Sequence, residues 1–65
     1  MLVIQYRNAG QIQEKTYRSA NEFVSAQYRE VPDLEDYYEI IAVTLDGKAI
    51  EVPGKTIGDL FSVLA

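Results

Sequence analysis

The stretch Ile41–Val52, IAVTLDGKAIEV, decides the fold, because Asp46-Gly47 lies between two apolar runs rich in β-branched residues. An Asp-Gly pair in this setting is a strong signal for a β-hairpin with a two-residue turn. Side chains alternate along a strand, so the turn sets which residues share a face. The expected pairs are Leu45 with Lys48, Val43 with Ile50 and Ile41 with Val52, and their common face is apolar except for Lys48.

A short helix is expected directly after this hairpin, over residues 56–64. Thr56 and Asp59 have the spacing of a capping box, in which each side chain bonds a backbone N–H of the first turn. The apolar residues that follow recur at the spacing of one helical face. They are Ile57, Leu60, Phe61 and Leu64.

The first half of the chain predicts another hairpin, with strands over residues 2–7 and 11–17. A three-residue loop, Asn8-Ala9-Gly10, would place Ile4 opposite Glu14, which is an awkward pair for a buried face. The loop could therefore be one residue longer or shorter, or the second strand could carry a bulge or lie at the sheet edge. Its polar alternation favours an edge strand.

A helix is expected after this first hairpin as well. Ser19 and Glu22 have capping-box spacing, and apolar residues including Phe23 follow at helical positions. The helix should end near Arg29 or Glu30, because Pro32 cannot continue it. Tyr28 is expected to anchor this helix.

The two halves resemble each other. Adding 37 to a residue number places Gly10 on Gly47 and Ser19 on Thr56. This spacing predicts two ββα units in tandem, although short connections alone would also produce it. A single hairpin is marginal in water, whereas two units could share one sheet.

The sequence therefore predicts one α+β domain over residues 1–65, with the order ββαββα, a four-stranded antiparallel sheet and both helices on one face. Its halves span about 1–29 and 37–65, joined by a solvated acidic connector over 30–36. The expected core consists of Ile4, Tyr6, Phe23, Val24, Ile41, Val43, Ile50, Val52, Ile57, Leu60, Phe61 and Leu64.

Composition argues against several classes of function. The 65 residues include no cysteine and no histidine, which removes thiolate sites, disulfides and the commonest general base. No catalytic, metal or nucleotide motif is present, so we expect no enzyme activity and no cofactor. The net charge is −4, with about +2 on residues 1–29 and −6 on residues 30–65. A general binder of nucleic acid would be basic overall.

The leading functional hypothesis is a protein-interaction module. Tyr38, Ile40, Ala42 and Thr44 are expected on the outer face of the third strand, which would make that face unusually apolar. A partner protein, or a second copy forming a homodimer, could pack there or pair with an edge strand.

The alternative is a weak binder of nucleic acid or another anion. Arg7, Lys15 and Arg18 could form a small basic surface on the first hairpin, with Tyr17 between them. Cations combined with stacking rings are typical of single-strand binding sites. The overall acidity makes a nucleic-acid partner the less favoured hypothesis.

The chain as a whole resembles small single-domain proteins of unknown function from streptococci and related lactic-acid bacteria. The resemblance lies in the strand-first start Met1–Tyr6, the tyrosine-rich acidic middle Pro32–Glu39, the Leu45–Lys48 turn and the Thr56–Leu64 helix. It implies a bacterial cytoplasmic protein and brings no activity or functional residue. No segment has the length of a membrane span, and no signal peptide is evident, which agrees with that location.

Overall fold

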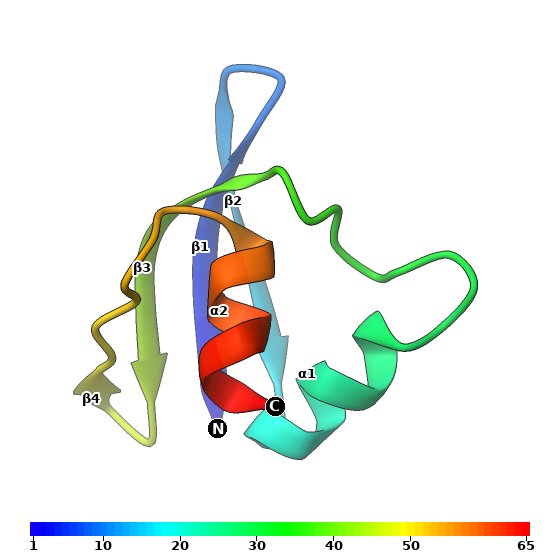
Figure 1. Ribbon diagram of the computed structural model, residues 1–65. Helices are drawn as coiled ribbons and strands as arrows, with labels where there is room; N and C mark the ends of the chain where they lie inside the picture. Colours follow the sequence, from blue (N-terminus) through cyan, green and yellow to red (C-terminus); the bar gives the residue numbers. More distant parts are fainter.

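The computed structural model describes residues 1–65 as one antiparallel sheet with both helices on the same face (Figure 1). The chain order is ββαββα, which confirms the predicted fold class. In the sheet the strand order is β2-β1-β3-β4, so β1 lies inside the sheet and pairs with β2 on one side and β3 on the other. The elements are β1 (Leu2–Asn8), β2 (Gln11–Tyr17), α1 (Ala20–Gln27), β3 (Glu39–Leu45), β4 (Lys48–Ala49) and α2 (Ile57–Leu64).

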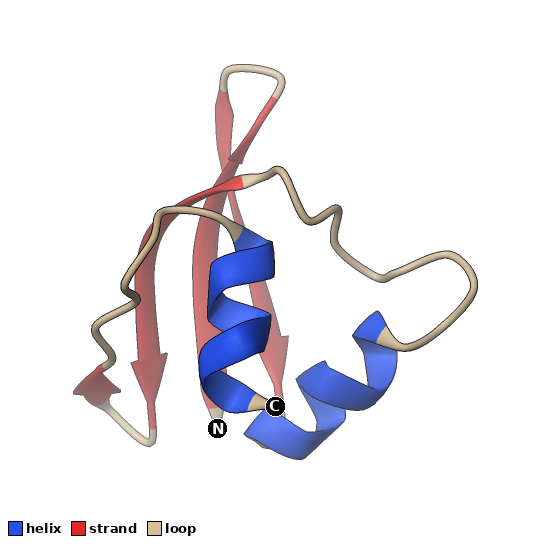
Figure 2. Cartoon of the chain, in the orientation of Figure 1, coloured by secondary structure: helices blue, strands red, loops and turns tan.

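Two tight turns with positive φ build the hairpins (Figure 2). Ala9-Gly10 has φ values of 53° and 79°, and Asp46-Gly47 has values of 53° and 83°. Positive φ at both central residues defines a type I′ turn, whose twist matches that of the strands. The predicted pair of Leu45 with Lys48 is confirmed, and the Ile50 N–H donates to the Val43 carbonyl at 2.9 Å.

The first hairpin has a shorter loop than the three-residue loop considered from the sequence. Only Ala9 and Gly10 lie between the strands, so Ile4 pairs with Lys15 and Tyr6 with Gln13. The awkward pairing of Ile4 with Glu14 does not occur. β2 lies at the end of the sheet, which confirms the predicted edge position.

A β-bulge in β3 changes which side chains face the helices. Gln5 pairs with Ala42, whereas the next residue, Tyr6, pairs with Ile40, so Ile41 has no partner on β1. An extra residue inverts the alternation of side chains on either side of it. Ile40 therefore packs against the core and Ile41 is 40% exposed, so the prediction of Ile41 as a core residue is wrong.

β4 is shorter than expected and ends at Ala49 instead of Val52. The chain then leaves β3 and returns to it, where the Ile40 N–H donates to the Lys55 carbonyl at 2.6 Å. The expected pair of Ile41 with Val52 is therefore wrong, because the bulge interrupts β3 and Pro53 lacks an N–H to donate. β3 itself begins at Glu39.

The helix starts agree with the sequence, but the end of α1 differs. Ser19 caps α1 by accepting the Glu22 N–H at 3.2 Å, and Thr56 forms the complete capping box with Asp59. α1 ends at Gln27, before the expected Arg29 or Glu30. Tyr28 follows it and is 73% exposed, but its ring meets the Phe61 ring of α2 edge-on with the ring centres 5.4 Å apart. It therefore joins the end of α1 to α2 at the surface and does not enter the core.

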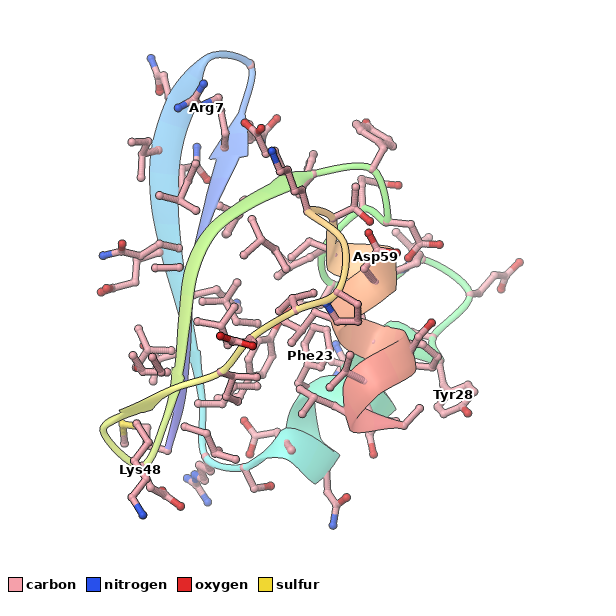
Figure 3. All side chains as sticks on the ribbon, turned by 60° about the vertical axis from the view of Figure 1, so that its left-hand side comes forward. Arg7, Phe23, Tyr28, Lys48 and Asp59 are labelled. Atoms are coloured by element: carbon pink, nitrogen blue, oxygen red, sulfur yellow. The ribbon has the colours of Figure 1, made fainter.

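The core lies between the sheet and the two helices, and Figure 3 shows Phe23 pointing into it. Six predicted core residues are buried, whereas Val24, Ile50, Val52, Phe61 and Leu64 are partly buried around them. A domain of this size has few positions that neighbours can cover on every side. The prediction missed four buried residues: Leu2, Tyr17, Ala26 and Leu34.

The acidic connector packs on the domain instead of being fully solvated. Leu34 is 3% exposed. The Gln27 side chain donates to the Leu34 carbonyl at 2.8 Å and accepts its N–H at 3.0 Å. These two bonds replace the backbone pairing that an irregular segment lacks.

The face assignment in β3 can be checked by truncating two nearby residues. Val43→Ala should lower the free energy of unfolding by about 2 kcal/mol, because it leaves a cavity in the core. Ile41→Ala removes a larger side chain yet should cost less than about 1 kcal/mol, because that side chain already meets solvent. Urea unfolding followed by circular dichroism measures both values. Equal losses would contradict the bulge.

The contribution of the α2 cap to stability can be tested by substituting Gly54, which lies outside the cap but next to the Asp59 side chain. A Cβ on Gly54 would lie 1.8 Å from Asp59 Oδ2, the oxygen that accepts from the Thr56 hydroxyl at 2.9 Å. Gly54→Ala should therefore displace the Asp59 side chain and cost about 1–2 kcal/mol in urea unfolding. Combined with Asp59→Ala, it should cost less than the sum of the two single losses. Strict additivity would show that the cap is not what the new methyl group disturbs.

Candidate interaction site at the free edge of β2

β2 is the one long strand of the sheet with an unpaired side (Figure 1). All seven of its residues pair with β1, and no strand lies beyond it. The opposite edge is largely covered, because β4 and the returning chain at Lys55 and Thr56 both bond to β3. The sheet therefore offers one extended edge.

The turn determines which backbone groups of this edge are free. Asn8 and Gln11 flank the two-residue turn and form a hydrogen-bonded pair, and such pairs alternate along an antiparallel ladder. Every second residue from Gln11 therefore bonds to β1. The residues between them direct their N–H and C=O groups away from the sheet, and all three are exposed: Ile12, Glu14 and Thr16.

A groove of about 330 Å³ runs beside this edge on the helix side, between β2 and α1. Lys15–Tyr17 forms one wall, and Glu22 and Ser25 of α1 lie on the other. Arg29 and Asp33, from the chain after α1, complete the lining. The groove is polar and carries both signs of charge.

A hydrogen-bonded cluster holds the lining of the groove in place. The Tyr17 hydroxyl donates to Asp33 Oδ2 at 2.6 Å, and Lys15 Nζ lies 3.4 Å from the same oxygen. The bond from Tyr17 is the main reason that the pKa of Asp33 is lowered, and the Lys15 charge lowers it further. Burial, followed by the bond to Asp33, raises the pKa of Tyr17. At neutral pH the donor is therefore a neutral phenol and the acceptor a carboxylate.

Two charges in the groove have no partner in the protein. The side-chain ion pairs are Lys15–Asp33 and Arg7–Glu39, so neither Arg29 nor Glu22 takes part in one. Arg29 and Asp33 line the same groove, and the Arg29 charge contributes to lowering the pKa of Asp33. An unpaired guanidinium keeps all of its N–H donors available for a ligand.

The residues predicted as an interface do not share one face of β3. Tyr38 and Ile40 lie on the helix side, where the Tyr38 ring stacks on Tyr6 with the ring centres 5.4 Å apart. Ala42 and Thr44 lie on the outer face. The bulge separates the two pairs, so the prediction of a common outer face is wrong.

The outer face of the sheet has no helix over it, but it is less apolar than expected. Without Tyr38 and Ile40, its centre consists of the short side chains of Val3, Ala42 and Thr44. Around them lie polar pairs, such as Arg7 with Glu39 at 3.7 Å, and the exposed Ile12, which pairs with Arg7 across the strands. This face offers no large anchoring side chain at its centre.

The three predicted anion contacts lie far apart as well. Arg7 lies near the turn of the first hairpin and pairs with Glu39 on the outer face (Figure 3). Lys15 lies on the helix side and pairs with Asp33, while Arg18 follows the other end of β2. The structure does not bring these three cations to one surface.

Tyr17, Asp33 and Arg29 were not predicted to belong to one site. The feature of the sequence that could have placed Tyr17 in this site is the length of the first turn. A two-residue loop puts Tyr17 on the same face of the sheet as Ile4. Nothing local indicated that Asp33 would return to β2 from a connector 16 residues along the chain.

The structure is therefore a small α+β domain whose sheet has one free edge, at β2. The sequence matches, over residues 2–65, the model of a family described as a domain of unknown function, DUF4649, so the chain belongs to that family. No curated protein and no solved structure matches the chain. None of its helices has the length and apolar character needed to cross a membrane.

The Tyr17–Asp33 bond predicts a pH-dependent contribution to stability. Because the pKa of Asp33 is lowered in the folded state, its contribution is present above its ordinary pKa of 3.8 and is lost as the pH falls through the lower folded value. Tyr17→Phe should cost about 1–2 kcal/mol at about pH 7 and clearly less at about pH 3. Urea unfolding at the two pH values measures the difference.

Tyr28→Phe is the matched control for this experiment, since the Tyr28 side chain is largely exposed and its hydroxyl makes no hydrogen bond within the protein. It should change stability little at either pH. If Tyr17→Phe had the same cost at both pH values, the charge of Asp33 would not contribute to the bond.

Proposed function

We propose that this protein is a non-enzymatic interaction module that binds an extended segment of another protein along the free edge of β2. The observation that carries this proposal is the outward row of backbone donors and acceptors at Ile12, Glu14 and Thr16. Adding a strand to such an edge is an established way to bind a peptide, because main-chain hydrogen bonds supply the affinity.

The difference between the two sheet edges supports this function. Proteins usually block exposed edges with short strands, bulges, proline or a covering segment. The β3 side has these features, since β4 has two residues and Pro53 follows it. β2 has seven residues, no proline and an uninterrupted register with β1. Its charged side chains limit non-specific association without covering the backbone.

Pairing between two copies of β2 is less favourable than binding another protein. The symmetric antiparallel register that pairs all seven residues is centred on Glu14 and places the two Glu14 side chains opposite each other. A register centred on Lys15 does the same with two lysines. Like charges directly opposite each other destabilise a strand pair.

The alternative of a nucleic-acid or anion binder has less support. Arg7 and Lys15 already pair with carboxylates, and Arg18 lies at the far end of β2 from Arg7. The resemblance to proteins of lactic-acid bacteria supports the bacterial cytoplasm as the proposed location of the module.

A proline at the centre of the edge tests the proposed function. The Glu14 N–H points away from β1, so Glu14→Pro removes a free donor without removing a bond of the ladder. Peptides from a randomised display library that bind the wild-type protein should lose at least about tenfold in affinity for this variant, as expected when an added strand cannot pair. Isothermal titration measures the affinities, and amide NMR spectra check that the variant is folded.

Glu14→Ala is the control, because it removes the same charge and keeps the N–H. It should bind the peptides as the wild type does. Failure to select any peptide, or equal binding by Glu14→Pro, would contradict an edge-binding function. In wild-type spectra the bound peptide should shift the amide signals of Ile12, Glu14 and Thr16 most.

A further inference from the structure

We infer that the segment bound along β2 carries an acidic side chain opposite Lys15, which enters the groove beside α1 and meets Arg29. This inference rests on the proposed function and specifies its ligand. The ligand class is an extended peptide of another protein with an aspartate or glutamate at one defined position.

The pleat of the sheet decides which ligand side chains reach the groove. In a strand added to β2, residues opposite Lys15 and Tyr17 point to the helix side, and residues opposite Glu14 and Thr16 point to the outer face. The groove lies on the helix side, between Lys15–Tyr17 and α1. A ligand residue opposite Lys15 is therefore directed into it.

The charges at this point of the groove favour a carboxylate. Lys15, Arg29 and Asp33 together leave one net positive charge, and Asp33 already accepts from Tyr17 and lies beside Lys15. Arg29 has no ion pair, so its guanidinium can bind a carboxylate with two parallel hydrogen bonds. The Lys15 side chain is 44% exposed and can approach the same group.

The one unpaired acid of the groove lies elsewhere along it. Glu22 is in the first turn of α1, whereas Arg29 follows the last turn. The five residues from Glu22 to the end of α1 at Gln27 alone rise by about 8 Å, and Arg29 lies beyond them. Glu22 therefore leaves the site at Lys15 and Arg29 positive, and it repels a carboxylate placed near the start of α1.

A second copy of this protein cannot supply the acidic side chain by pairing β2 with β2 in the same sheet. The helix-side residues of β2 are Gln11, Gln13, Lys15 and Tyr17, and none of them is acidic. Glu14, the acid of the strand, points to the outer face. The strand that supplies the acidic side chain is therefore not β2 of a second copy.

Charge reversal at Arg29 tests this inference. A randomised octapeptide display library is selected in parallel on the wild type, on Arg29→Glu and on Arg18→Glu. The wild type should enrich aspartate or glutamate at one position, and Arg29→Glu should lose that preference and enrich lysine or arginine there. Arg18→Glu is the matched control, because Arg18 is also an exposed arginine without an ion pair but lies outside the groove. It should keep the wild-type preference.

A synthetic peptide from the wild-type selection provides the quantitative measurement. Replacing its acidic residue by the corresponding amide should weaken binding to the wild type by about three- to tenfold, as expected for one partly exposed charge-assisted contact. The same replacement should have little effect on binding to Arg29→Glu. Isothermal titration gives both ratios.

The outcomes separate this inference from the function on which it rests. If the selected peptides need the free Glu14 N–H but show no preference for an acidic residue, the inference of an acidic ligand is wrong, whereas binding along the edge is still supported. An acidic preference that persists in Arg29→Glu would also overturn it. If no peptide is selected, or if binding survives Glu14→Pro, both proposals fall.

Discussion

The pairing of β1 with β3 is the constraint on which the rest of the structure depends. It joins the first strand to one that begins more than 30 residues later, and it places the two hairpins in a single sheet. It also makes β1 the centre of the core, since Leu2, Ile4 and Tyr6 are all buried beneath the helices. Neither hairpin alone could bury its apolar face, so both helices depend on this pairing for a surface to cover.

The bulge opposite Gln5 and Tyr6 determines what each face of the sheet presents. With uninterrupted alternation, Ile40 would lie on the outer face and Ile41 in the core. The bulge moves Ile40 to the helix side, beside the stacked rings of Tyr6 and Tyr38, and leaves Ile41 exposed. The outer face consequently loses the apolar residues that favoured it as an interface. The most distinctive free surface of the domain is instead the backbone edge of β2.

In the proposed function, that edge combines two kinds of recognition. The backbone groups at Ile12, Glu14 and Thr16 can hold any extended chain, so by themselves they supply affinity without selectivity. The groove beside them adds selectivity, because Tyr17 and Asp33 hold Lys15 in place while Arg29 remains unpaired. For the proposed ligand, the strand backbone and the Tyr17–Asp33–Lys15 contacts are in place before it binds, which lowers the entropy cost of ordering them.

The sequence by itself determined the local features of this protein: the Asp46-Gly47 turn, the caps at Ser19 and Thr56, the apolar spacing of α2 and the order ββαββα. Each depends on residues within about four positions of one another, where turn chemistry and helical geometry act directly. Only the tertiary structure decided the strand order, the bulge at Ile41 and the return of Asp33 to Tyr17. These depend on contacts between distant segments. A shift of one residue in strand register, such as that between a two- and a three-residue turn at Ala9-Gly10, changes which residues of the whole strand face the core.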